Sequence, residues 1–396
     1  MEFSILWYIP VFLVSLVFVA VVIPSIVKVA NKINLFDVQD GRKVHKGNVP
    51  RLGGISFLPA ILFTLLIVVA VMVRLLPPDI HGLYYVPMTE IMMAAAGCVL
   101  LYLAGIMDDV IGVSYGSKFI IQILAALLIC CSGLYISDLY GILGIHSLHP
   151  VIGVPLTIVI IVFIINSINL IDGIDGLASG LCILSCIGYA LMFNYLEMSM
   201  NLVLTVSMIG VLFMFYLYNT LGKPGKTKIF MGDTGSLTMG FIIAFFAVKL
   251  CCFNEFLADE PLTGQMLFVY AISVIFVPVM DVFRVFFARI CDGRSPFYPD
   301  KRHIHHKFLA LGYTMRQTRW IIFAMSFAFF AMNVSLSFIA NVNINIVIIA
   351  DILAWTLLNM LISSRVRRLQ SQHNEIAESF VDVGKPKLWL KRIWKR

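Results

Sequence analysis

Long apolar segments recur along the whole chain and constrain its fold more than any other feature. Segments long enough to span a bilayer lie at about residues 3–27, 54–73, 90–107, 118–137, 151–170, 177–196, 201–218, 236–254, 265–283, 320–339 and 345–362. Apolar residues make up 60% of the 396 residues and charged residues 13%, whereas soluble domains average roughly 45–50% and about 25%. The sequence therefore predicts an all-α, polytopic membrane helix bundle with about 11 transmembrane helices.

The distribution of Lys and Arg predicts how this bundle is oriented, because connections on the cytoplasmic side are enriched in both. If the N-terminus lies outside, the inside stretches 28–52, 108–118, 219–235, 284–319 and 365–396 hold 27 of the 29 Lys and Arg residues. Only Arg74 and Lys249 then lie outside. We expect one transmembrane domain over residues 1–364, with cytoplasmic loops at 28–52, 108–118, 171–176, 219–235 and 284–319, and a basic cytoplasmic tail at 365–396.

Residues 165–180 carry a polar ladder at the end of an apolar run. Its members follow one another at three-residue steps: Asn166, Asn169, Asp172 and Asp175. Residues three apart on a helix lie on adjacent turns of nearly the same face, and Gly173 and Gly176 allow the backbone to leave helical geometry there. A helix cap and turn would explain one acid and one glycine but not four polar residues in register. We therefore expect a ligand at this helix end.

Two adjacent acids, Asp108 and Asp109, end the third apolar segment. Acids at a helix C-terminus oppose the macrodipole, so local structure does not favour them. Neighbouring carboxylates suit cation binding, or a proton acceptor beside a cation. Lys118 follows closely and could hold a phosphate, or could simply extend toward the membrane edge.

Two further inside stretches combine glycine with charge. In residues 218–237, Asp233 lies between Gly232 and Gly235, after three lysines. A glycine-rich helix start suits phosphate, and Asp233 suits Mg²⁺, which takes one or two carboxylates together with substrate phosphates. The first loop, residues 40–54, is basic, includes Arg51, and ends in a double glycine where backbone could approach a ligand. The bias of positive charge toward the inside would also produce such a loop.

The longest inside loop contains three histidines, His303, His305 and His306, among Lys and Arg residues. Zinc is one reading, but the neighbouring cations repel a metal ion. Donors directed at a diphosphate fit better. Together, the acids, the polar ladder and the basic loop on one face are what a Mg²⁺-dependent transfer of a phosphosugar from a nucleotide to a lipid phosphate requires.

The chain resembles the polyprenyl-phosphate N-acetylhexosamine-1-phosphate transferase family over roughly residues 28–312. The motifs that carry the resemblance are D-D-V-I-G at 108–112, N-x-x-N-L-I-D-G-I-D-G-L-A at 166–178, F-M-G-D-T-G-S-L at 230–237 and H-I-H-H at 303–306. The resemblance implies transfer of a sugar 1-phosphate from a UDP-sugar to undecaprenyl phosphate, with release of UMP. It also implies Mg²⁺, with Mn²⁺ as the alternative, and a cytoplasmic site in the bacterial inner membrane.

The resemblance also implies roles for residues at matching positions. Asp108 would be the base or the acid that faces the lipid phosphate, with Asp109 supporting it. Asn169 and Asp233 would hold the metal, Asp175 and Asn219 would contact the uridine, and Lys118, His305 and His306 would contact phosphate. We group His303 with the catalytic residues, and Asn166, Asp172 and Arg51 with the substrate-binding residues.

Two branches of the family compete, and a transporter is the non-enzyme alternative. Muramoyl-pentapeptide transferases usually carry P-I-H-H-H where this chain has His303-Ile304-His305-His306-Lys307. That departure favours the branch that uses UDP-N-acetylglucosamine and initiates O-antigen, lipopolysaccharide, teichoic acid or related cell-wall glycans. Asp351, inside the last apolar segment, is the one acid that suits transport, and pairing within the bundle is the simpler explanation for it. No nucleic-acid partner is expected, and a homodimer is left open.

Overall fold

The computed structural model describes residues 8–33, 35–36, 49–75, 88–253, 263–296 and 300–372. Most of the basic first loop and residues 373–396 of the expected tail lie outside these ranges. The chain divides into two compact units, Met1–Val274 and Ile275–Arg396, and we describe each by itself. The expectation of one domain over residues 1–364 stays a prediction.

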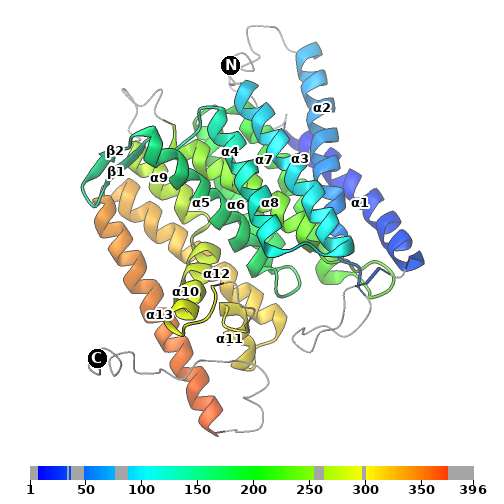
Figure 1. The fold of residues 1–396 in the computed structure, drawn as a ribbon. Helices are drawn as coiled ribbons and strands as arrows, with labels where there is room; N and C mark the ends of the chain where they lie inside the picture. The colour runs from blue at the N-terminus through cyan, green and yellow to red at the C-terminus, as the bar shows by residue number, and fades with distance from the viewer. Residues whose placement is uncertain are drawn as a thin grey trace. The chain divides into compact units, whose positions relative to one another are not determined.

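The first unit is a helix bundle with one small hairpin (Figure 1). Its elements are α1 (Tyr8–Lys32), η2 (Gly53–Ser56), α2 (Phe57–Leu75), α3 (Met88–Ile111), α4 (Tyr115–Cys131), β1 (Asp138–Ile142), β2 (Ile145–Ser147), α5 (Pro150–Ile171), α6 (Leu177–Tyr195), α7 (Ser199–Leu221), α8 (Gly232–Cys251) and α9 (Gly264–Ser273). The second unit contains α10 (Phe276–Cys291), α11 (Ile304–Ala310), α12 (Met315–Val334), the π-helical turn η5 (Ser335–Ile339) and α13 (Ile344–Gln372).

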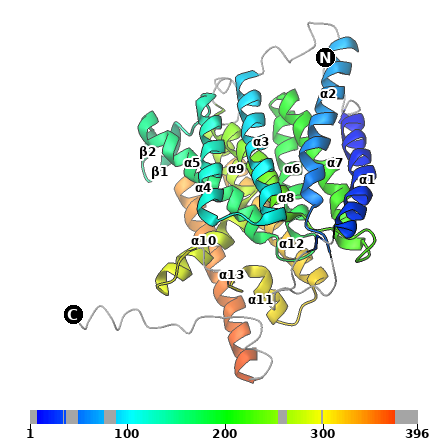
Figure 2. The ribbon, with the colours of Figure 1, turned by 45° about the vertical axis from the view of Figure 1, so that its right-hand side comes forward.

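Helix α8 is the core of the first unit. Every residue in it except Lys249 is buried. Helices α3 and α5 pack along it, and α6, α9 and η2 also contact it; α3 lies beside α8 in both Figure 1 and Figure 2. Such all-round burial is typical of a helix enclosed by other helices rather than of one that faces lipid. The N-terminus of α8 is therefore held firmly on several sides.

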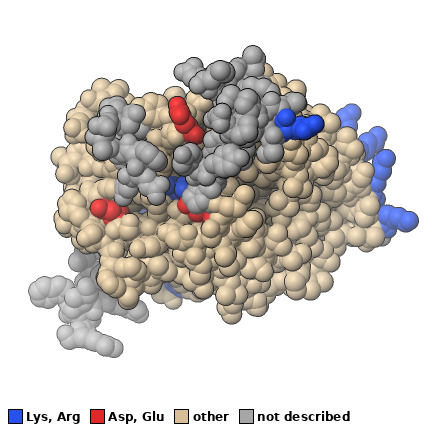
Figure 3. All heavy atoms as spheres, turned by 90° about the horizontal axis from the view of Figure 1, so that it is seen from above, with Lys and Arg blue, Asp and Glu red and all other residues tan. Residues whose placement is uncertain are grey.

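The outer helices present apolar side chains outward. On α1 the buried positions recur every four residues, at 11, 15, 19, 23 and 27, while Leu13, Val17 and Val21 are about half exposed or more. An exposed apolar face of this kind is what a lipid environment requires. Seen from above in Figure 3, most of the described surface carries no charge, and Lys and Arg gather mainly at one margin.

The all-α polytopic membrane class is confirmed. Among the described residues, nine helices are long and apolar enough to cross a membrane, or ten if the bent pair α9 and α10 is one span. Helix α4, expected as a span over 118–137, has only 17 residues. It is followed by the antiparallel β1–β2 hairpin, which the sequence analysis did not expect. The helix count of about 11 and the orientation of the termini stay predictions.

The expected span 265–283 is not one continuous helix, because it is interrupted at residues 274–275. Pro278 lies just after the interruption. Proline has no N–H to donate and fits best in the first turn of a helix, where α10 places it. The carbonyl of Val274 would otherwise bond to the N–H of residue 278, and it instead accepts a hydrogen bond from the Ser185 hydroxyl at 3.1 Å.

Helix α10 packs against α12 in the second unit, and α11 packs against both α12 and α13. An aromatic cluster holds these helices together. The ring of Phe276 lies 4.6 Å from that of Phe329 and 6.0 Å from that of Trp355, measured between centroids. Such pairs add stability beyond the area they bury.

Candidate active site

Three carboxylates meet where α3 ends and α8 begins. Asp108 and Asp109 lie in the last turn of α3, and Asp233 lies in the first turn of α8. One oxygen of each lies within 4.8 Å of the others, a separation that a single metal ion could bridge. We call these three residues the acidic cluster.

Asp109 caps the N-terminus of α8 from a different helix. Its carboxylate accepts hydrogen bonds from the backbone N–H of Asp233 at 2.8 Å and of Thr234 at 2.9 Å, and from the Thr234 hydroxyl at 2.7 Å. The first N–H groups of a helix have no partner within it, and its positive end attracts an anion. The unfavourable position of Asp109 at the end of α3 is therefore offset by a favourable one at the start of α8. Both of its oxygens are therefore engaged with the first turn of α8.

Glycines allow the backbones to approach closely enough for this contact. A Cβ on Gly105 of α3 would lie 2.3 Å from the Cα of Thr234, and one on Gly54 would lie 2.0 Å from the backbone nitrogen of Gly235. Gly232 has a φ of +71°, which favours glycine. The end of the first inside loop also pairs with the segment before α8, since the Gly53 N–H donates to the Phe230 carbonyl at 2.9 Å. The three acids can meet because the backbones of α3 and of the segment before α2 approach the start of α8 this closely.

Two cations partly balance the acidic cluster. The Lys118 ammonium lies 2.8 Å from an oxygen of Asp108 and 2.6 Å from an oxygen of Asp233. The Arg51 guanidinium lies 3.6 Å from the other oxygen of Asp233, and its side chain is 42% exposed. Three carboxylates facing two cations leave a formal charge of −1. Sequence analysis placed Lys118 on a phosphate; here its ammonium lies between two acids.

The polar ladder does not stay on one helix face. Asn166 and Asn169 lie on α5, Asp172 ends that helix, and Asp175 lies in the turn before α6. The Asn169 amide donates to the Ser236 hydroxyl at 2.8 Å, which ties it to the first turn of α8 beside the acidic cluster. The Asn166 amide points instead to α4, where it donates to the side-chain oxygen of Gln122 at 2.7 Å. The ladder therefore spreads over several neighbours.

The remaining predicted residues of the first unit line the connections beside α6 and α8. Asp175 forms an ion pair with Lys228. Asn219 is buried, accepts a hydrogen bond from the Gly176 N–H and donates to the Ile229 carbonyl at 2.8 Å. Asn219 thus joins the start of α6 to the segment before α8. Asp172 is exposed, and no described residue hydrogen-bonds to its carboxylate.

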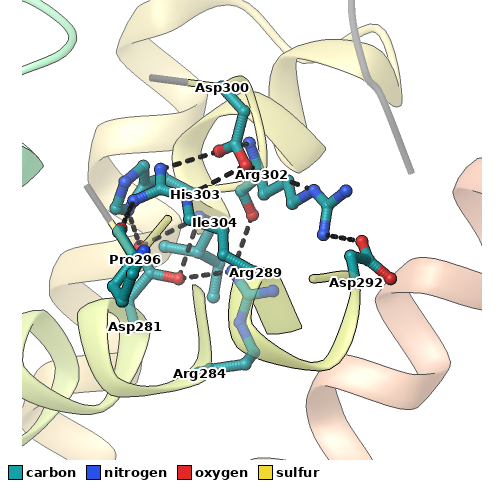
Figure 4. Close-up of polar contacts among 9 residues, drawn as sticks. All are labelled: Asp281, Arg284, Arg289, Asp292, Pro296, Asp300, Arg302, His303 and Ile304. Carbon is teal, nitrogen blue, oxygen red and sulfur yellow. Dashed lines mark hydrogen bonds and ion pairs between the residues drawn. The ribbon is translucent and has the colours of Figure 1, made fainter. Parts of the chain in front are cut away.

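In the second unit, a buried acid on α10 contacts the segment 292–303 that joins α10 to α11 (Figure 4). We call this segment the histidine loop. Asp281 accepts hydrogen bonds from the Nδ1 of His303 at 2.8 Å and from the backbone N–H of Ile304 at 3.1 Å. It also pairs with Arg284 at 2.8 Å. Asp281 was missed by sequence reasoning, although an acid within an apolar segment was a usable signal.

A second set of ion pairs closes the same loop. The Arg289 guanidinium binds both oxygens of Asp300, at 2.9 and 3.0 Å, and Arg302 pairs with Asp292 at 2.6 Å. Figure 4 shows these side chains converging from α10 and from the segment before α11. Bidentate arginine–carboxylate pairs fix geometry as well as charge. The loop is therefore built around its own ion pairs.

His305 and His306 follow directly on α11. Both ring nitrogens of His305 are buried without a hydrogen-bond partner among the described residues. Burial, and then the positive charges of His303 and Lys301, lower the pKa of His306 to about 4. Both rings are therefore neutral at pH 7 and can donate one hydrogen bond each. The three histidines lie in the second unit, and the other predicted site residues lie in the first.

Asp351, the acid considered for transport, has a partner within its own unit. Its carboxylate accepts a hydrogen bond from the Asn333 amide at 3.0 Å, between α12 and α13. Pairing within the bundle therefore accounts for it.

Comparison with known proteins places these features in a family. A model of glycosyl transferase family 4 matches residues 91–251, which include the acidic cluster and the polar ladder. The chain is 30% identical over 326 residues to the probable undecaprenyl-phosphate N-acetylglucosaminyl 1-phosphate transferase of Bacillus subtilis (strain 168), covering 80% of this chain and 82% of that protein. It is 31% identical over 298 residues to the undecaprenyl-phosphate alpha-N-acetylglucosaminyl 1-phosphate transferase of Escherichia coli (strain K12), covering 73% of each. The chain therefore belongs to glycosyl transferase family 4, the polyprenyl-phosphate N-acetylhexosamine-1-phosphate transferases.

Proposed function

We propose that this protein transfers N-acetylglucosamine 1-phosphate from UDP-N-acetylglucosamine to undecaprenyl phosphate and releases UMP. An oxygen of the lipid phosphate bonds to the phosphorus that carries the sugar. The bond from that phosphorus to the bridging oxygen breaks, and UMP leaves with the electron pair. The product is a lipid-linked sugar diphosphate that begins a cell-surface glycan. The names of the relatives support the transferred group, N-acetylglucosamine 1-phosphate, and the acceptor, undecaprenyl phosphate.

The observation that carries the proposal is the acidic cluster at the buried N-terminus of α8. One oxygen of each carboxylate lies within 4.8 Å of the others, and among the described residues two cations pair with Asp108 and Asp233. Asp233 is buried and Asp108 and Asp109 are half-buried, and carboxylates removed from water without full charge balance are stabilised by a further cation. Carboxylate and amide oxygens are also the ligands that Mg²⁺ prefers. The residues therefore fit a divalent metal.

Asp233 and Asn169 would hold this metal, and Asp108 borders the same space. Mg²⁺ at this position would neutralise charge on the diphosphate of the donor. Asp109 holds the first turn of α8, so that Asp233 keeps its position. Arg51, exposed at the edge of the cluster, would attract the anionic donor.

The other predicted residues would bind the two substrates. Asp172 and Asp175 lie at the turn beside Asn219, and with Asn166 we assign them to the nucleotide side. When substrate enters, the Lys118 ammonium would leave one of its two carboxylate partners and bind a phosphate oxygen. His303, His305 and His306 would donate hydrogen bonds to phosphate oxygens. We place the site on the cytoplasmic face of the bacterial inner membrane, where UDP-sugars are available.

The test is UMP release by the purified full-length chain with undecaprenyl phosphate and Mg²⁺. UDP-N-acetylglucosamine and UDP-N-acetylmuramoyl-pentapeptide are offered separately, each with and without a chelator. We expect release with the first donor only, and none with chelator. Release with the second donor alone would overturn the assignment of the sugar and keep the reaction. If folded protein released no UMP with any of a wider panel of UDP-sugars, the proposed reaction would be refuted.

A further inference from the structure

A cavity of about 310 Å³ lies within the second unit, between α10, α11 and α13. None of the residues predicted for the transfer reaction lines it. Its lining combines three cations with polar and apolar side chains, and it contains no Asp or Glu. We call it the α13 pocket.

Each of the three helices contributes one cation to the α13 pocket. These are Arg284 of α10, Lys307 of α11 and Arg367 of α13. The Lys307 ammonium donates to the side-chain oxygens of Asn359 at 3.1 Å and of Ser363 at 3.0 Å, so neutral oxygens hold it in place. Arg284 pairs with Asp281 at 2.8 Å, whereas neither Lys307 nor Arg367 forms an ion pair among the described residues. The pocket therefore has positive charge that the described part of the chain does not balance.

The pKa of Lys307 is lowered in this arrangement. Burial, and then the positive charge of Arg284, lower the pKa of Lys307 to about 7; Asp281 opposes this shift, and Arg367 adds to it. An ammonium with this environment is stabilised by any anion that enters between the three groups. The pocket thus favours an anionic occupant over an empty state.

The lining is graded along α13, which is apolar and long enough to span a membrane. Trp355 and Met360 line the pocket toward the middle of this helix, and Ser363 and Arg367 line it toward the end. Twelve residues of helix extend about 18 Å. Met360 is 61% exposed, and its neighbours Leu357 and Leu361 are 59% and 55% exposed. Beside the pocket, the exposed surface of α13 is therefore apolar toward the middle of the helix, and the pocket is cationic toward the end of the helix, which matches the two ends of an amphiphile.

We propose that the α13 pocket binds the phosphate head group of an anionic membrane lipid, with the lipid chains along the exposed apolar side of α13. Guanidinium groups match phosphate oxygens in geometry, and the ammonium adds a point charge. The inner leaflet is rich in anionic lipids, which basic residues at a membrane edge attract. A free phosphate would satisfy the cations but would leave the exposed apolar side of α13 without an occupant.

The test compares two arginines on the same helix. Arg367 lines the pocket, whereas Arg365 is exposed two residues earlier and does not. The full-length chain in neutral detergent is titrated with phosphatidylglycerol or phosphatidylcholine, and bound lipid is counted by native mass spectrometry. We expect phosphatidylglycerol to bind more tightly than phosphatidylcholine. Arg367→Gln should weaken phosphatidylglycerol binding about tenfold, because a hydrogen bond to a charged group is lost. Arg365→Gln should change it less than about twofold.

Two further measurements make the result decisive. Lys307→Gln, from a different helix, should weaken phosphatidylglycerol binding in the same direction as Arg367→Gln. Inorganic phosphate at millimolar concentration should fail to displace the lipid. Full displacement by phosphate would assign the pocket to a soluble anion and overturn the lipid. Equal losses in the Arg367 and Arg365 variants, or equal binding of the two lipids, would overturn the site.

Discussion

The acidic cluster of the first unit and the histidine loop of the second unit both gather charged side chains, but they balance charge differently. In the cluster, Asp108 and Asp233 pair with Lys118 and Arg51 among the described residues, and Asp109 caps the N-terminus of α8. In the loop, Asp281 and Asp300 are each enclosed by two basic side chains. The cluster retains negative charge, whereas the acids of the loop are fully used in holding cations.

The difference shows how structure separates binding from positioning. An ion pair that is complete within the protein fixes geometry and has little affinity left for a ligand. A cluster that lacks a counter-charge can gain one from solution. We therefore expect substitution of Asp233 to affect metal binding and turnover first, and substitutions in the loop to affect local structure first.

The largest expected effect is on turnover in Asp233→Asn. The substitution removes the carboxylate that both Lys118 and Arg51 approach, and activity should fall about a thousandfold. UMP release at rising Mg²⁺ concentrations measures it, with thermal unfolding to show that the protein is folded. Glu197→Gln, an exposed acid in the connection between α6 and α7, is the matched control and should keep full activity. Turnover within tenfold of wild type for Asp233→Asn would remove this residue from the metal site.

Asp109→Ala should mainly destabilise the first unit. Three donors at the start of α8 would lose their acceptor, which should lower the free energy of unfolding by about 3 kcal/mol. Asp109→Asn keeps one oxygen acceptor and should lose less. Denaturant unfolding of both variants checks the order. If alanine and asparagine were equally harmless, Asp109 would not be the cap of α8.

Gly105→Ala tests the close approach of α3 and α8. The added methyl group would lie 2.3 Å from the Cα of Thr234, and overpacking should lower stability by about 2 kcal/mol. Gly116→Ala on α4 is the control, because no atom lies within 4 Å of its added Cβ. It should be neutral or up to about 1 kcal/mol more stable. Thermal unfolding separates the two, and equal behaviour would refute the packing argument.

Arg289→Lys tests the geometry of the histidine loop without changing its charge. Lysine cannot bind both oxygens of Asp300 at once, so stability should fall by about 1.5 kcal/mol. Arg316→Lys, on an exposed position of α12, should change stability by less than about 0.5 kcal/mol. Proteolysis of the loop under native conditions is a second readout. A loop as resistant to protease in Arg289→Lys as in wild type would show that charge alone maintains it.

A separate effect concerns the pH dependence of His306. The pKa of about 4 in the folded protein lies below the usual value of about 6.5. The unfolded chain therefore binds a proton more readily, and the contribution of His306 to stability is lost as pH falls from about 6.5 to 4. NMR titration of labelled histidine checks the midpoint. A midpoint near 6.5 would mean that the ring is hydrated.

Sequence-based predictions were most accurate for features that a local pattern determines. The length of the apolar segments predicted the helical membrane class, and the acids and glycines of four motifs indicated the family. They were wrong where one residue or a short segment changed the local secondary structure. Pro278 lies at the interruption of an apolar segment expected to form one helix, and the β1–β2 hairpin lies in the connection after α4, where no strand was expected.

The sequence by itself determined that this chain is a membrane-embedded helix bundle, because the number and length of apolar segments leave no other way to satisfy the backbone. Only the tertiary structure decided which charged groups meet. Lys118 and Asp233 are 115 residues apart, and Asp109 and Thr234 are 125 apart. The structure also showed that Asp281 holds His303. Such contacts depend on the packing of α3, α4 and α8, and of α10 with the loop before α11, and no local spacing in the chain encodes that packing.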